Sequence, residues 1–170
     1  DLLHLRLDFL DPTNVRRLKE AGCHSVNVGI ETGNRELRDK LLRRRMLNET
    51  MVAGCTLLRQ HGIRVFSNNM LGLPGASFKN DLETLELNRK CRVDYALATL
   101  WQPYPRTRLA EYAVEHGYFD GDYSKLTFTY YSTSPVRFDN PKDKRRVENL
   151  QKLFAVGAML FINWRWTDGV

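Results

Sequence analysis

The stretch SVNVGIETGN, residues 25–34, decides the fold class of this chain. Residues 25–30 form a short β-branched run, which predicts a buried strand. Asn34 then starts a helical pattern that carries Leu37 and Leu41 on one face. A strand that leads directly into a helix is a βα unit, and the same order recurs on both sides of this stretch.

The preceding βα unit begins with an alternating, strand-like run at residues 3–7. Asp11 and Pro12 supply an N-cap and a first-turn proline for its helix. After the central stretch, Asn48 is expected to cap a further helix that ends at Gly62. The strand-then-helix order is therefore repeated.

Two more strands follow along the chain. Residues 63–71 predict a third strand that leads into the turn GLPG at residues 72–75, after which Ser77 can cap a helix. Residues 94–101 predict a fourth strand, followed by the rigid turn PYP at residues 103–105 and another helix. Four βα units in series imply an α/β protein with a parallel sheet and right-handed crossovers.

Parallel strands place their functional loops at the carboxyl ends, whether the sheet closes as a barrel or stays open. The loops to inspect begin at Asp8, Glu31, Gly72 and Gln102. We expect these four loops to lie along one rim of the sheet.

The last fifty residues predict an extension. Residues 118–140 are aromatic and polar with weak periodicity, which indicates an ordered loop or a short strand covering the sheet. Pro141 opens a last helix with an apolar stripe, which predicts packing on the sheet. The stripe consists of Val147, Leu150, Leu153, Phe154 and Gly157. Residues 163–166 hold two tryptophans, which are expected to pack rather than to form a partner surface.

The composition is that of an ordinary globular protein. The chain has 170 residues, of which 42% are hydrophobic and 27% are charged, so one compact unit is expected. No leader is recognisable, and the longest apolar run, residues 153–162, is about half of the ~20 residues that span a bilayer. A cytoplasmic protein with no transmembrane segment is expected. Residues 1–7 look like a strand already under way, which predicts a truncated start.

Cysteines and histidines offer no metal site or catalytic group. Cys23, Cys55 and Cys91 are far apart and odd in number, which favours reduced thiols over a disulfide framework. None of them stands in a CxxC or CxxxCxxC arrangement. The four histidines fall in different βα units, and His61 and His116 stand at helix ends, where a cation is favourable. No catalytic residue and no metal ligand is therefore predicted within the chain.

The net charge of +6 is concentrated in two stretches. The first contains Arg35, Arg38, Lys40, Arg43, Arg44 and Arg45, and the second contains Lys142, Lys144, Arg145 and Arg146. Such patches can attract phosphates or nucleic acid. Charged runs beside helical patterns are more often solvated faces, and that is the favoured interpretation.

Glu31 is the main candidate for a binding residue. It directly follows a buried-looking strand and lies between Gly29 and Gly33, which let a ligand approach the backbone closely. Its carboxylate can accept hydrogen bonds from hydroxyls or an ammonium group. It can equally be the partner of one of the many nearby arginines, and composition leaves both interpretations open.

Three segments, in this order, carry a family resemblance: RLDFLDPTNVRRLKEAGCHSVNVGIETGN (6–34), LLRQHGIRVFSNNMLGLPGAS (57–77) and DYALATLWQPYPRTRL (94–109). They resemble strands three to six of a radical S-adenosylmethionine (radical SAM) barrel. The resemblance implies a partial TIM-type (β/α) barrel with about four βα units over residues 1–120, and an extension over residues 121–170 whose helix packs on the barrel. The most similar subgroup carries a cobalamin-binding domain ahead of the barrel.

The resemblance also implies cofactors and partners. Members bind a 4Fe–4S cluster through three cysteines after the first strand, and these would precede Asp1. S-adenosylmethionine at the cluster is split to a 5′-deoxyadenosyl radical, and cobalamin would be held by an upstream domain. A small-molecule or lipid-like substrate and an electron donor such as flavodoxin or ferredoxin are expected. An enzyme that modifies RNA, or an inactive barrel fragment with a binding role, are the alternatives.

One wall of the S-adenosylmethionine site is implied for this chain. Glu31 takes the position that in relatives faces the ribose or methionine part of the cofactor. Arg43 or Arg44 takes the position of the arginine that pairs with the cofactor's carboxylate. Relatives differ by one residue in this spacing, so the resemblance does not choose between the two arginines.

Three further positions complete this wall. Asn68 matches a polar residue that reaches the ribose, while the backbone around Leu73 and Gln102 is expected to bracket the adenine. The sequence departs from the family pattern at two turns. Ala76 removes a carboxylate expected to steady the first turn, and Arg106 replaces a flexible glycine in the second. Arg106 therefore narrows that loop or supplies a substrate contact.

Overall fold

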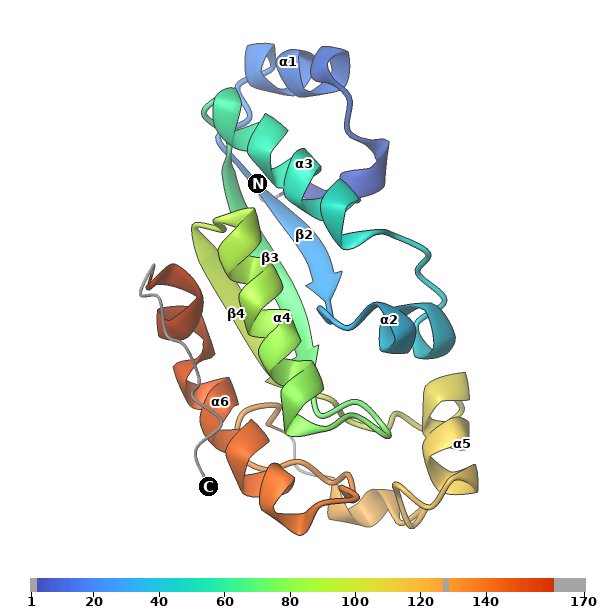
Figure 1. Ribbon diagram of the computed structural model, residues 1–170. Helices are drawn as coiled ribbons and strands as arrows, with labels where there is room; N and C mark the ends of the chain where they lie inside the picture. Colours follow the sequence, from blue (N-terminus) through green and yellow to red (C-terminus); the bar gives the residue numbers. More distant parts are fainter. Residues whose placement is uncertain (1–2, 127–128, 161–170) are drawn as a thin grey trace.

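The computed structural model describes residues 3–126 and 129–160 and has an α/β fold around one parallel sheet (Figure 1). The strands are β1 (Leu3–Leu5), β2 (Ser25–Glu31), β3 (Arg64–Leu71) and β4 (Tyr95–Leu100). The helices are α1 (Pro12–Glu20), α2 (Arg35–Leu41), α3 (Asn48–Gln60), α4 (Phe78–Cys91), α5 (Arg108–Glu115) and α6 (Pro141–Met159). Short 3-10 turns lie at η1 (Leu7–Phe9) and η2 (Tyr123–Lys125).

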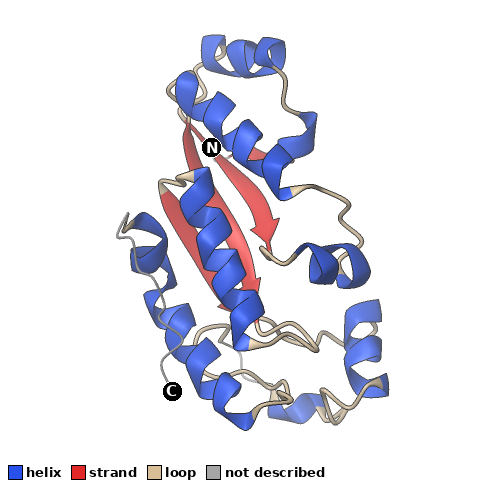
Figure 2. Cartoon of the chain, viewed as in Figure 1, coloured by secondary structure: helices blue, strands red, loops and turns tan. Residues whose placement is uncertain are grey.

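The four strands pair in the order in which they occur in the sequence, and every pair is parallel. Figure 2 shows the strands behind the helices that connect them. The predicted βα units and parallel sheet are confirmed. The first strand is shorter than predicted, because Leu7 begins the turn η1 and its side chain is buried there. No closed barrel forms from the described residues, and the four-stranded sheet is open.

The two faces of the sheet have different environments. Alternate residues of β2 are buried, and Val26, Val28 and Ile30 form part of the hydrophobic core beneath the helices. Figure 1 shows α3 and α4 on this side of the sheet. The intervening positions, including Asn27 and Gly29, are only half-buried. We call the side of the sheet that carries these positions the open face.

Two of the predicted helix caps are confirmed. Asp11 accepts hydrogen bonds from the backbone N–H groups of Thr13 and Asn14 at the start of α1. Ser77 forms a reciprocal capping box with Asn80 at the start of α4. These caps satisfy N–H groups that lack partners within the helix.

The predicted cap at Asn48 is wrong. Leu47 occupies the N-cap position of α3, and Asn48 is the first helical residue. The Asn48 side chain accepts a hydrogen bond from Arg38 and donates one to the carbonyl of Gly33. It is therefore committed to contacts outside its own helix.

The extension covers the carboxyl end of the sheet. The expected ordered loop is present, with no strand in its described part. The backbone N–H of Leu100 donates to the carbonyl of Tyr130 over 2.8 Å. The Phe138 ring lies against the backbone of Gly72. This loop therefore packs on the turns that follow β3 and β4.

Helix α6 packs on β4 and α4 as predicted, through Val147, Phe154 and Ala158. The assignment of Leu153 to the buried stripe is wrong, because its exposure is 65%. Residue 153 lies on a different side of the helix from the buried positions 147, 154 and 158. The predicted packing of residues 163–166 falls outside the described residues.

Among the helices that the structure describes, none is long and apolar enough to cross a membrane.

Candidate functional site

Glu31 ends β2 in a strained turn at the carboxyl rim of the sheet. Its backbone φ is 65°, and the N–H of Thr32 donates to the carbonyl of Ile30 over 2.9 Å around it. The register between β2 and β3 shifts at this point. A residue other than glycine in this conformation costs roughly 1–3 kcal/mol and persists only where its surroundings hold it, which is common at ligand sites.

The Glu31 carboxylate pairs with Arg44, whose Nη1 lies 2.5 Å from Oε1. Both side chains are mostly buried, with exposures of 21% for Glu31 and 24% for Arg44. Burial raises the pKa of Glu31, and the Arg44 charge and hydrogen bond oppose this rise. The pair is a partly desolvated charge pair rather than a solvated surface contact.

Gly29 provides the space for this pair. A Cβ atom at Gly29 would overlap the Glu31 carboxylate and lie 2.7 Å from Nη1 of Arg44. Any side chain here would displace the ion pair, which occupies the place of a side chain on the open face. Asn68 lies directly opposite Gly29 in the β2–β3 register and is half-buried on the same face.

The structure brings Arg44, and not Arg43, to Glu31. Arg43 is exposed and has a φ of 52°, so its side chain leaves the loop toward solvent while Arg44 turns inward. The two interpretations of Glu31 therefore meet in one place. It is the partner of a nearby arginine, and it stands at the rim where a ligand would bind.

Arg38 is a buried residue that the sequence reasoning missed. Interpreting the first basic stretch as a solvated face is wrong for this position, where the exposure is 0%. Its guanidinium donates to the carbonyls of Thr32 and Met46 and to the Asn48 side chain. A signal was present in the sequence, because Arg38 stands three residues before the buried Leu41 on the same helix face.

Other members of the basic stretches form ion pairs. Arg35 pairs with Asp39 at 3.6 Å and remains exposed, as expected of a solvated face. In the second stretch, Lys144 pairs with Glu148 and Arg146 lies 3.5 Å from Asp143. Part of the local positive charge is therefore neutralised within the protein, which weakens the case for a nucleic-acid surface.

The GLPG turn is held by a carboxylate, but not one at position 76. Asp81 of α4 is buried, and its Oδ2 accepts a hydrogen bond from the N–H of Gly72 over 3.0 Å. Burial raises the pKa of Asp81 to about 8, although the Gly72 hydrogen bond lowers it, and the charge of Asp143 adds to the rise. The carboxylate that Ala76 lacks is thus supplied from the next helix. Leu73 itself points its side chain into the core.

Two buried side-chain oxygen atoms, one on β2 and one just past β4, have no hydrogen-bond partner among the described residues. They are Oδ1 of Asn27, on β2, and Oε1 of Gln102, just past β4. The other end of Gln102 donates to the carbonyl of Thr133 over 3.4 Å. A buried polar atom without a partner costs about 1–3 kcal/mol, so both positions favour a ligand that donates hydrogen bonds.

Comparison with known proteins shows which family and which fold this chain is similar to. Residues 4–87 match the model of the Radical SAM superfamily. This segment, just under half of the chain, is similar to radical SAM proteins. The chain is also 26% identical over 109 residues to an uncharacterized methyltransferase of Pyrococcus horikoshii. This alignment covers 64% of this chain and 24% of that protein.

A solved structure agrees in fold. The coproporphyrinogen III oxidase HemN of Escherichia coli, described as a radical SAM enzyme, superposes with a TM-score of 0.63 and 16% identity. The match covers 88% of this chain and 31% of that protein. The chain therefore spans about a quarter to a third of the length of the relatives that it matches.

The described residues of this chain do not fit an iron–sulfur cluster. They contain no group of three histidine, cysteine or acidic side chains able to hold a metal. Cys55 and Cys91 are buried in the core, and their mutual hydrogen bond, together with burial, raises the pKa of Cys55. His61 and His116 are the C-cap residues of α3 and α5, as expected of helix-end residues.

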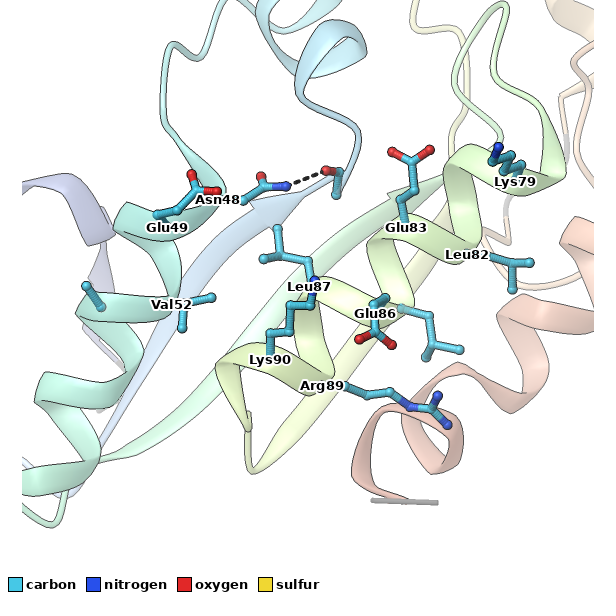
Figure 3. A pocket seen from close by; sticks show the side chains of 13 residues that line it. Asn48, Glu49, Val52, Lys79, Leu82, Glu83, Glu86, Leu87, Arg89 and Lys90 are labelled. Atoms are coloured by element: carbon cyan, nitrogen blue, oxygen red, sulfur yellow. Dashed lines mark hydrogen bonds between the residues drawn. The ribbon is translucent and has the colours of Figure 1, made fainter. Parts of the chain in front are cut away.

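A separate groove of about 700 Å³ lies between α3 and α4 (Figure 3). Apolar side chains such as Val52, Leu82 and Leu87 line it, with charged residues at its edges. It lies among the helices, on the opposite side of the sheet from the open face. Its lining approaches the rim at Gly33 and Asn48. The Glu31–Arg44 ion pair lies at the rim and does not line this groove.

Proposed function

We propose that this chain is the carboxy-terminal part of a radical SAM enzyme and that its open face forms one wall of the S-adenosylmethionine site. The observation that carries this proposal is the strained Glu31 turn with its Arg44 partner above Gly29. The rim of a parallel sheet is the usual place for a ligand in this fold class.

The donor set fits this cofactor. The Arg44 guanidinium suits the carboxylate of the methionine part, and Glu31 suits its ammonium group or the ribose hydroxyls. Asn68 and the unpaired Asn27 oxygen lie on the same face to take further ribose contacts, while Gln102 lies at the β4 end for the adenine. When bound, the cofactor supplies radical chemistry, and these residues orient it and exclude water.

The remaining features of the enzyme are also proposals. The methyltransferase relative supports methyl transfer as the reaction. That the substrate is small or lipid-like is a further part of the proposal. The cluster ligands would lie in a part of the protein outside this chain, with residues 1–120 as barrel and residues 121–170 as an extension. A cobalamin domain and an electron donor such as flavodoxin or ferredoxin would complete the system.

The test compares Arg44→Ala with Arg43→Ala in the complete, reconstituted protein. Arg44→Ala is expected to weaken S-adenosylmethionine binding roughly ten- to a hundredfold, because one charge-assisted contact contributes about 1.5–3 kcal/mol. Arg43→Ala, one residue away and exposed, should leave affinity within about twofold. Titration of the cofactor is measured alongside iron content, which should not change. Equal affinities of both variants and the wild type would refute the proposed site.

A further inference from the structure

The buried Arg38 side chain joins the two backbone segments that carry Glu31 and Arg44. Its Nη1 donates to the carbonyl of Thr32, the residue directly after Glu31, over 2.6 Å. Its Nη2 and Nε donate to the carbonyl of Met46, two residues after Arg44, over 2.6 and 3.2 Å. One guanidinium therefore spans from the end of β2 to the far side of the α2–α3 loop.

The Arg44 backbone is bound into the same arrangement. Its N–H donates to the carbonyl of Arg38 over 3.2 Å, and its carbonyl accepts from the N–H of Met46 over 2.9 Å. On the other side, the N–H of Gly33 donates to Oγ1 of Thr84 on α4 over 2.9 Å. The end of β2 is thus fixed to α4, and Arg38 fixes the Arg44 loop to the end of β2.

Stability alone does not account for an arginine at this position. Arg38 is fully buried, its acceptors are neutral oxygens, and burial lowers its pKa. Taking a charged group out of water is costly, and an apolar residue of similar volume is often as stabilising in such a place. What the guanidinium adds is geometry, because its planar, forked donors hold several acceptors at fixed angles.

We propose that Arg38 is a positioning residue for the cofactor site, whose guanidinium sets the placement of Arg44 relative to Glu31. This inference rests on the proposed function for its effect on S-adenosylmethionine, but the positioning itself concerns only residues of this chain. Arg38 does not touch the ligand. It acts through the Thr32 and Met46 carbonyls on the two side chains that do.

The first experiment measures cofactor binding in the complete, reconstituted protein. Arg38→Leu should weaken S-adenosylmethionine binding on the order of tenfold, because small displacements of binding groups are costly. Arg35→Leu is the matched control, since this arginine lies one turn earlier on α2 and is exposed. Arg38→Lys, which keeps the charge but lacks the fork, should give an intermediate loss and provides a second variant if Arg38→Leu does not fold.

A double-mutant cycle separates positioning from a merely structural role. In the Arg44→Ala background, Arg38→Leu should cause a much smaller further loss of affinity than in the wild type, because one of the two groups that it positions is gone. Independent, additive losses in the folded double variant would overturn the proposal.

A second readout needs no cofactor. The pKa of Glu31, followed by carboxyl ¹³C NMR with Glu31→Gln as the assignment control, should rise in both Arg38→Leu and Arg44→Ala and not in Arg35→Leu. If this pattern holds while Arg44→Ala leaves cofactor affinity unchanged, the proposed function fails and the positioning role stands. An unchanged Glu31 pKa in folded Arg38→Leu would overturn the positioning role itself.

Discussion

At the scale of single residues, Gly29 and Gly33 exclude a side chain for different reasons. A Cβ at Gly29 would meet only the ends of two flexible side chains, Glu31 and Arg44. A Cβ at Gly33 would overlap the backbone carbonyl of Glu83 on α4, which cannot move without moving the helix. The first glycine therefore serves the site, and the second serves the packing of β2 on α4.

Replacing each glycine by alanine should separate these two roles. Gly29→Ala should displace the ion pair and weaken S-adenosylmethionine binding roughly tenfold, with little change in the free energy of unfolding. Gly33→Ala should destabilise the domain by about 1–3 kcal/mol, as is usual when a packed backbone is overfilled. Urea unfolding and cofactor titration of both variants measure the difference. If Gly29→Ala binds the cofactor as the wild type does, the ion pair does not form part of the site.

At the scale of elements, a hydrogen bond from Gly72 to the Asp81 carboxylate joins the turn after β3 to α4. The Asp81 carboxyl group has a shifted pKa, so this contact depends on pH. The pKa of Asp81 is raised from 3.8 to about 8, so the folded protein holds its proton more tightly than the unfolded chain does. The resulting stability is fully present below the ordinary aspartate pKa and is lost as pH rises through the folded value.

The free energy of unfolding of the wild type should therefore fall between about pH 4 and about pH 8. Asp81→Asn keeps an oxygen to accept from Gly72 and removes the titration, so its stability should be flatter over the same range. Asp120→Asn is the control, because that exposed carboxylate has a lowered pKa and titrates below this window. Urea unfolding at several pH values measures all three proteins. Parallel pH profiles for wild type and Asp81→Asn would show that Asp81 is already ionised.

At the scale of the whole molecule, the described helices α3, α4 and α6 leave the open face of the sheet uncovered. Phe66, Met70 and Leu97 are half-buried there, and Tyr95 is exposed. Parallel sheets are almost always covered on both faces, and an uncovered apolar face favours association.

Residues 1–170 expressed alone should therefore self-associate as concentration rises. Leu97→Lys, on the open face, should reduce this association, while Leu153→Lys, on the exposed side of α6, should not. Sedimentation velocity over a range of concentrations measures both. A monodisperse monomer at every concentration would show that the open face does not drive association.

The sequence by itself determined the βα order, the parallel sheet and the position of Glu31 at its rim. The hydrophobic period, the helix caps and the turn residues act over a few neighbouring positions, so they can be recognised without knowing which segments pack together in the folded protein. Asp11 and Ser77 were predicted correctly as caps for this reason. The predictions for Asn48 and Leu153 failed because they depend on other elements of the fold. The hydrogen-bond partners of Asn48 lie outside its own helix, and the exposure of Leu153 depends on where α6 packs.

Only the tertiary structure decided how the rim is assembled. Six basic residues lie between positions 35 and 45, and no local rule states which one meets Glu31. The choice of Arg44, the burial of Arg38 and the contact of Asp81 with the turn before it all arise where one element of the fold packs against another. Burial then changes the energetics of each charge, because a group removed from water needs partners that only the folded chain supplies.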